Sequence, residues 1–105
     1  MFGRVGEEES EIMTSILVTE PNVCYICRRV GYTEIHHVLY GALRKIADDN
    51  GLTCYLCYEC HRGTKGVHGR DGNTLNRYLK AHVQTEYEKL HSHEEWMELV
   101  GRSYI

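Results

Sequence analysis

Apolar positions along the chain fall in short runs separated by glycines and polar turns, which predicts a small α+β domain. The opening run, MFGRVGEEESE, is acidic and has no hydrophobic period, so residues 1–11 are expected to be a disordered tail. Residues 12–19 are predicted to form a short helix or strand that leads to Pro21. Residues 12–105 are interpreted as one domain.

The centre of the chain predicts two strands joined by a helical connection. The run EIHHVLY has the β-branched and aromatic content of a strand of about six residues. Alternation along that strand sends His36 and His37 to opposite faces. Residues 42–49 are typical of one or two helical turns, and the Asn50-Gly51 pair predicts a turn into a second strand, LTCYL.

The second half predicts a glycine-rich loop followed by two helices. The run CHRGTKGVHGRDGN holds four glycines in fourteen residues, and each glycine inside a helix costs roughly 1 kcal/mol. It is therefore expected to be a loop that presents His61 and His68. A helix follows with Asn73 as its N-cap, and Ser92 with Glu95 forms a capping box for a last helix. The first of these helices has an apolar and aromatic stripe made of Leu75, Tyr78, Leu79, His82, Val83, Tyr87 and Leu90. His82 on this stripe is interpreted as a packed, hydrogen-bonded histidine.

Length and charge narrow the class of protein. A chain of 105 residues with 42% hydrophobic content has a thin core, for which a bound metal is a useful staple. Net charge is −3, which argues against a general nucleic-acid coat protein. Residues 24–82 nevertheless carry nine Lys and Arg against five acids, an excess of +4, between acidic flanks. No run approaches the roughly 20 apolar residues of a membrane span, and no basic-then-apolar leader opens the chain, so a cytoplasmic, reducing setting is expected.

The cysteines supply the strongest chemical signal. Two Cys-x-x-Cys pairs, Cys24/Cys27 and Cys57/Cys60, each offer two sulfurs from one turn, and together they predict a structural Zn²⁺ site with four thiolate ligands. The alternative is a set of reduced thiols buried as small hydrophobic side chains. Cys54 lies in an apolar strand and is interpreted as a packing residue.

The runs CYIC, EIHHVLYG and LTCYLCYECHRGTKGVHG together resemble the HNH endonuclease family, in particular small zinc-knuckle HNH-like proteins of phages and prophages, over roughly residues 15–105. The resemblance implies a ββα-metal domain with a four-cysteine zinc knuckle and C-terminal helices. By that resemblance His36 and His61 are ligands of a catalytic divalent ion, namely Mg²⁺, Mn²⁺, Ni²⁺ or Zn²⁺. His68 is the candidate for the third ligand of this ion. His37 corresponds to the general base.

The chain departs from the family pattern in two places. Family members usually place the last metal ligand one helical turn after the previous one, whereas Gly63 and Gly66 make the connection to His68 a loop. The family has an asparagine on the second strand that orients the loop carrying the base, and the register here puts Leu52 at that place. Asn50 is the nearby substitute and is taken as the candidate for this role.

These expectations lead to a function. An imidazole that is not bound to the metal can take a proton from water at neutral pH, so the predicted reaction is metal-dependent hydrolysis of phosphodiester bonds in double-stranded or branched DNA, in a bacterial cell if phage or prophage encoded. Two alternatives stay open: a catalytically decayed, zinc-stabilised nucleic-acid-binding or adaptor module, and a protein-interaction domain with acidic tails. Oligomeric state is not determined by the sequence. The basic residues expected to contact the DNA backbone are Arg62, Lys65, Arg70, Arg77 and Lys80.

Overall fold

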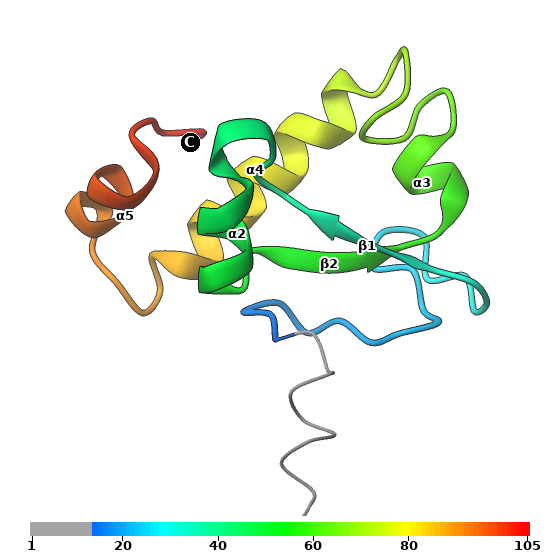
Figure 1. Ribbon diagram of the computed structural model, residues 1–105, viewed down its shortest axis with the longest axis horizontal. Coiled ribbons are helices and arrows are strands. Elements are labelled where there is room, and N and C mark those ends of the chain that lie inside the picture. The colour runs from blue at the N-terminus through cyan, green and yellow to red at the C-terminus, as the bar shows by residue number, and fades with distance from the viewer. Residues whose placement is uncertain (1–13) are drawn as a thin grey trace, which may run out of the picture.

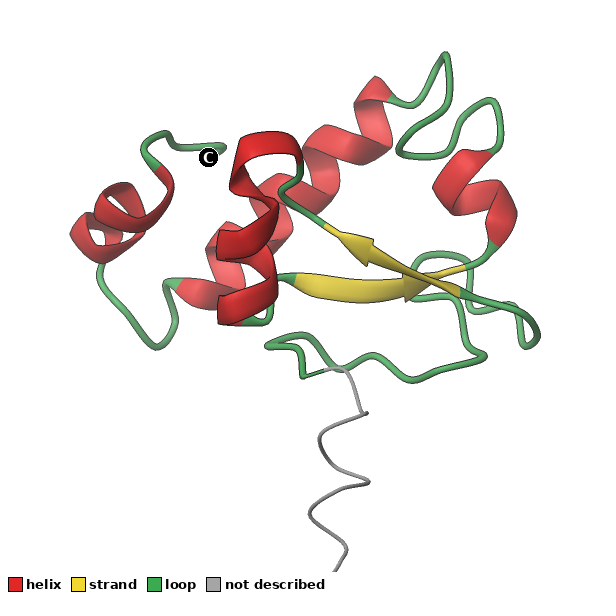
Figure 2. Cartoon of the chain, viewed as in Figure 1, coloured by secondary structure: helices red, strands yellow, loops and turns green. Residues whose placement is uncertain are grey.

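The structure is a computed structural model that describes residues 14–105, so the predicted acidic tail at residues 1–11 lies outside the described residues. The fold is α+β, with a two-stranded sheet at the centre of the described part and helices around it (Figure 1; Figure 2). The elements are β1 Glu34–His37, the 3₁₀ turn η1 Gly41–Leu43, α2 Arg44–Asn50, β2 Thr53–Leu56, α3 Tyr58–Arg62, α4 Asn73–Tyr87 and α5 His93–Val100.

The two strands pair antiparallel in the order that the sequence predicts. His36 lies opposite Cys54 and His37 opposite Thr53. β1 has four residues rather than about six, because the chain bends after His37, although the Val38 N–H still donates to the Leu52 carbonyl at 2.9 Å. His36 is buried and His37 is partly exposed, so the predicted alternation of the two histidines is confirmed.

Helix α2 ends at a glycine that the backbone requires. Gly51 has φ of 69°, the left-handed conformation that favours glycine, and the Leu52 N–H returns to the Ala47 carbonyl. A Cβ on Gly51 would lie 3.2 Å from backbone atoms of Thr14, Ser15 and Ile16. The Asn50-Gly51 pair is thus a helix C-terminus that also makes room for the segment packed against it.

That preceding segment corrects a prediction. A helix or strand was expected over residues 12–19, and residues 14–19 form neither. Their hydrogen bonds go to the turn between α2 and β2 instead: the Ser15 hydroxyl contacts the carbonyls of Thr53 and Gly51, and the Ile16 N–H donates to Gly51. Because these donors are already used across the turn, no regular local pattern forms.

Helix α4 packs along a narrower stripe than predicted. Leu79, Val83 and Gln84 are buried, whereas Tyr78 is exposed and Leu90 lies beyond the helix end, in solvent. The N-cap is Gly72, so Asn73 is the first helical residue rather than the cap. The buried Gln84 was not predicted: its amide nitrogen donates to Glu88 and Ser103, and its oxygen accepts from the Tyr104 N–H at 2.6 Å.

Two further predictions about the helices are confirmed. Ser92 and Glu95 form a complete capping box at the start of α5. His82 is partly buried and hydrogen-bonded, with its Nε2 2.7 Å from the Tyr25 hydroxyl. The contact between His82 and Tyr25 ties α4 to the first cysteine turn.

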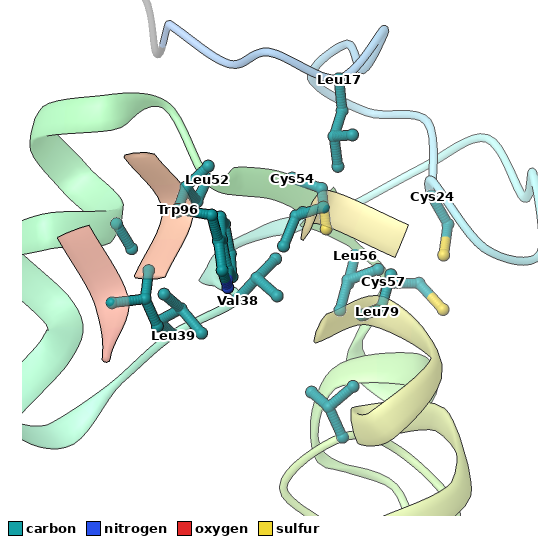
Figure 3. Close-up of a cluster of buried hydrophobic side chains, with 14 residues drawn as sticks. Leu17, Cys24, Val38, Leu39, Leu52, Cys54, Leu56, Cys57, Leu79 and Trp96 are labelled. Carbon is teal, nitrogen blue, oxygen red and sulfur yellow. The ribbon is translucent and has the colours of Figure 1, made fainter. Parts of the chain in front are cut away.

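The core is one cluster in which cysteines sit among aliphatic side chains and Trp96 (Figure 3). The Trp96 ring is fully buried, and its Nε1 donates to the Arg102 carbonyl at 2.8 Å. Figure 3 shows the sulfurs of Cys24 and Cys57 on the same side of this cluster. The hydrophobic core therefore borders the cysteine site.

Candidate metal centres

Four cysteine sulfurs converge at one side of the sheet. The Sγ atoms of Cys24, Cys27, Cys57 and Cys60 all lie within 4.8 Å of one another. The sulfurs of Cys27 and Cys57 are 3.7 Å apart, and a tetrahedral site with Zn–S bonds of about 2.3 Å has edges of about 3.8 Å. The four cysteines can thus hold a metal ion such as zinc, as the spacing predicted.

The two turns meet because the first one is attached to β2. The Tyr25 N–H donates to the Tyr55 carbonyl at 2.8 Å, two residues before Cys57. Each turn then folds around its own first sulfur: Cys27 N–H approaches the Cys24 sulfur and Cys60 N–H the Cys57 sulfur, both at 3.4 Å. The second turn is also the start of α3, because Cys57 is the N-cap of that helix.

The electrostatics of the cysteine site suit a cation. Burial by itself raises the pKa of the Cys24 thiol, but contacts with the backbone N–H groups of Cys57 and Cys27 lower that pKa to about 6. Burial, together with contacts to Cys24 and Cys57, acts the other way on Cys60 and raises the pKa of its thiol. Metal ligation needs thiolates, so a bound cation would have to favour deprotonation of Cys60. Cys54 differs: it is fully buried, burial raises its pKa to about 12, and it lies outside the cysteine site, in agreement with a packing role.

Three histidines form a second cluster. His36 comes from β1, His61 from α3 and His68 from the loop that follows α3, and one ring nitrogen of each lies within 4.8 Å of the others. Their ring centroids are 4.9 to 5.1 Å apart. His61 belongs to a helix rather than to the predicted loop, because α3 continues through Arg62 before the glycines begin.

The buried imidazole of His36 has ring nitrogens that could bind a metal. Among residues 14–105, neither ring nitrogen of His36 has a hydrogen-bond partner, although the side chain is 1% exposed. Burial, together with the neighbouring His61 and His68, lowers its pKa to about 3. The imidazole is therefore neutral, and a neutral imidazole is what a divalent metal requires. Imidazole donors suit Zn²⁺ and Ni²⁺ better than Mg²⁺, which prefers oxygen ligands.

A carboxylate behind the cluster orients His61. Glu34 Oε1 lies 2.7 Å from His61 Nδ1, which leaves Nε2 of that ring for the centre of the cluster. Arg62 completes the arrangement with two hydrogen bonds to Glu34, at 2.9 and 2.6 Å. The Arg62 guanidinium and His61 lower the pKa of Glu34 to about 2, so it stays ionised.

The glycine-rich loop has a regular, hydrogen-bonded backbone that positions His68. Glycines recur at every third position, and the N–H of Gly66, Gly69 and Gly72 each donates to the carbonyl of the preceding glycine in the series. A Cβ on Gly69 would clash with the Gly63 carbonyl oxygen, so the coil tolerates no side chain there. The His68 N–H donates to the His61 carbonyl at 2.9 Å, which fixes the two residues relative to each other.

The histidine cluster opens into a pocket of about 210 Å³ that also contains the predicted base. His37, Tyr40 and Arg44 line this pocket together with the three clustered histidines. His37 Nε2 lies 3.2 Å from Asp48 Oδ1 on α2, so its Nδ1 is the nitrogen not held by that carboxylate. His36 thus lies in the cluster and His37 lies on the wall of the same pocket.

Other predicted site residues lie elsewhere. The Asn50 amide donates to the Ile46 carbonyl at 2.9 Å within its own helix, and the pocket lining in the described residues does not include it. Leu52, at the position of the family asparagine, is fully buried in the core. The Arg62 guanidinium donates two hydrogen bonds to Glu34, through Nε and one terminal nitrogen. The remaining predicted cations are placed on the glycine-rich loop and on α4: Lys65, Arg70, Arg77 and Lys80.

Comparisons with protein-family models, with curated proteins and with solved structures find no match to this chain. In the described residues, no helix has both the length and the apolar character needed to cross a membrane. The candidate function therefore depends on the geometry of the two metal centres.

The sequence reasoning missed several residues of the site, among them Glu34, Tyr40, Arg44 and Asp48. Glu34 had a readable signal, because it stands two positions before His36 on the same strand and so shares its face. Asp48 and Arg44 had none, since their place beside His37 depends on how α2 folds back over β1.

Proposed function

We propose that this protein is a metal-dependent endonuclease of the HNH type that hydrolyses phosphodiester bonds in DNA. The observation that carries the proposal is the pocket in which three histidine nitrogens converge, with a fourth imidazole and an arginine on its wall. A cluster of imidazole nitrogens next to a histidine outside the cluster provides a metal site and a base in one cavity.

The residues take distinct roles. His36, His61 and His68 would hold a divalent ion, which when bound polarises a phosphoryl oxygen and offsets charge on the leaving oxygen. Glu34 and Arg62 keep His61 oriented. Arg44 places a positive charge on the pocket wall, where it can bind the anionic phosphate.

His37 acts as the general base. Asp48 accepts a hydrogen bond from Nε2 of His37, which selects the tautomer whose Nδ1 is free to take a proton from water. The Asp48 contact supplies the orientation that the family draws from an asparagine. The resemblance to the HNH family assigns the products 5′-phosphate and 3′-hydroxyl ends.

One observation favours a second candidate, a zinc-stabilised nucleic-acid-binding or adaptor module without activity. The position of the family asparagine is occupied by the buried Leu52, and Asn50 is bonded within its own helix. In this candidate the cysteine site maintains the fold and the histidine pocket has lost its chemistry.

Nicking of supercoiled plasmid DNA with Mg²⁺, Mn²⁺, Ni²⁺ or Zn²⁺, together with metal analysis of each variant, tests the proposal. His37→Ala should keep both metals and lose about 10² to 10⁴-fold in rate, the usual contribution of a general base. His61→Ala should lose the second metal but keep the cysteine-bound zinc.

The matched control is His91→Ala, which removes an exposed imidazole that stacks on Tyr87 outside the pocket. It should cleave like the wild type. A wild-type protein that binds one metal and cuts nothing with any of the four ions would reject the nuclease and favour the adaptor. Full activity in His37→Ala would reject only its assignment as the base.

A further inference from the structure

Aromatic and cationic side chains alternate in a row that starts at the histidine pocket. The Tyr40 ring lies 5.0 Å from the His68 ring, and its hydroxyl accepts a hydrogen bond from the Asn76 amide at 2.8 Å. Lys80 Nζ lies 4.8 Å from the centre of the Tyr40 ring and 5.5 Å from that of Tyr104. The row, here called the tyrosine–lysine strip, consists of Tyr40, Lys80, Tyr104 and Arg102, whose guanidinium is 5.2 Å from the centre of the Tyr104 ring.

The strip joins two hollows in the surface. Tyr40 belongs to the wall of the histidine pocket. Tyr104 belongs to the wall of a second hollow of about 290 Å³, which Arg77 and Tyr78 of α4 also line. Residues 102–105 return beside α4 and close to the start of η1 (Figure 1), so Lys80 lies near the rings of both Tyr40 and Tyr104 although the two tyrosines are far apart in the sequence.

The cations of this surface are available to an anion. Within residues 14–105, Lys80, Arg77 and Arg102 take part in no ion pair, in contrast to Arg62 on the other side of the pocket. Lys80 has a long flexible side chain. When its ammonium turns to a phosphate, the ring faces that it covers become free for stacking.

We infer that the tyrosine–lysine strip binds a single-stranded DNA segment that leads away from the histidine pocket. Positive groups that follow a phosphate backbone, with aromatic rings on which successive bases stack, are the features of single-strand binding. A duplex offers its phosphates to such a surface but keeps its base faces stacked inside the helix. The inference rests on the proposed function in one respect: it makes DNA with unpaired nucleotides the substrate class.

The test measures binding without added divalent ions, so that no cleavage occurs and only the cysteine-bound zinc is present. Fluorescence anisotropy compares a labelled oligothymidylate of about 12 nucleotides with a duplex of similar length. Tyr104→Leu keeps apolar packing but removes the aromatic face. It should weaken single-strand binding about 5- to 150-fold, the usual effect of losing one stacked base, and leave duplex binding unchanged.

Two further variants distinguish a loss of stacking from a loss of folding. Tyr104→Phe retains the ring and should bind the single strand like the wild type. The matched control is Tyr58→Leu, since Tyr58 is an exposed tyrosine on α3 with a cation, Arg62, 5.7 Å from its ring centre, but outside the strip. It should leave both affinities unchanged.

Lys80→Gln keeps the inference testable if Tyr104→Leu melts early. It should weaken single-strand binding and reduce the slope of log affinity against log salt by about one. The control Lys89→Gln should do neither, because Lys89 lies beyond the end of α4 and pairs with Glu86. An unchanged single-strand affinity in both Tyr104→Leu and Lys80→Gln would overturn the inference. Equal losses of affinity for the single strand and the duplex in a folded Tyr104→Leu protein would also overturn it. If single-strand binding depends on the strip but the protein cuts no plasmid, the proposed nuclease function is rejected and the inference about the strip stands.

Discussion

Replacement of the buried His36 by leucine gives the sharpest test of the histidine metal site. The His36 side chain is 1% exposed, and neither of its ring nitrogens has a hydrogen-bond partner within residues 14–105. An unsatisfied buried polar group costs about 1 to 3 kcal/mol, and leucine fills a similar volume. Without an ion at the histidine site, His36→Leu should therefore keep the free energy of unfolding or raise it by about 1 to 3 kcal/mol.

A bound ion should reverse the order of stability of the wild type and His36→Leu. A ligand present at 100 times its dissociation constant stabilises the state that binds it by about 2.7 kcal/mol. Wild-type protein should gain this amount when Ni²⁺ or Mn²⁺ is added, because His36, His61 and His68 are all in place. His36→Leu should gain nothing from the added ion, while its cysteine-bound zinc stays.

Urea unfolding at one equivalent of zinc, with and without the second ion, measures both effects. The control is His82→Leu, because His82 is a partly buried histidine with a satisfied hydrogen bond to Tyr25. It should lose about 1 kcal/mol and respond to the ion as the wild type does. If ion-free His36→Leu is less stable than the wild type by about 2 kcal/mol or more, as an order-of-magnitude threshold for a core residue, the histidine is structural. Equal stabilisation of both proteins by the ion would also refute the ligand assignment.

Three more predictions follow from the same structure. Cys57→Ala should unfold or aggregate the chain, because zinc-binding energy is also folding energy, whereas Cys54→Ala should keep its zinc; circular dichroism and a metal count check both. Gly69→Ala drives a Cβ into the Gly63 carbonyl oxygen, so it should cost about 1 to 3 kcal/mol and abolish ion binding by the histidine cluster in a metal titration. The ion-free wild type should lose about 2 kcal/mol more than His36→Leu between pH 7 and pH 5 in urea titrations. The sign follows because the pKa of His36 is lowered from 6.5 to about 3 in the folded chain, so the unfolded chain binds the proton first as pH falls, and equal losses would contradict the buried neutral imidazole.

Several features were determined by the sequence because they depend only on interactions between residues that are close in the chain. A Cys-x-x-Cys turn brings its own two sulfurs together, and Ser92 with Glu95 closes a capping box within one turn of helix. The opposite faces of His36 and His37 follow from the two-residue period of any strand. These local rules hold wherever the segment is placed, so they could be predicted.

The tertiary structure alone decided how those pieces form sites. Glu34 reaches His61 and Arg62 across 27 and 28 positions, and its place there depends on α3 folding back over β1. Asn50 was expected near the base and Asp48 occupies that place, because the rotation of α2 decides which side chain faces β1. The strip from Tyr40 to Tyr104 likewise exists only after residues 102–105 return to α4. Contacts of this kind depend on the packing of the whole chain, and no short segment of sequence contains the information.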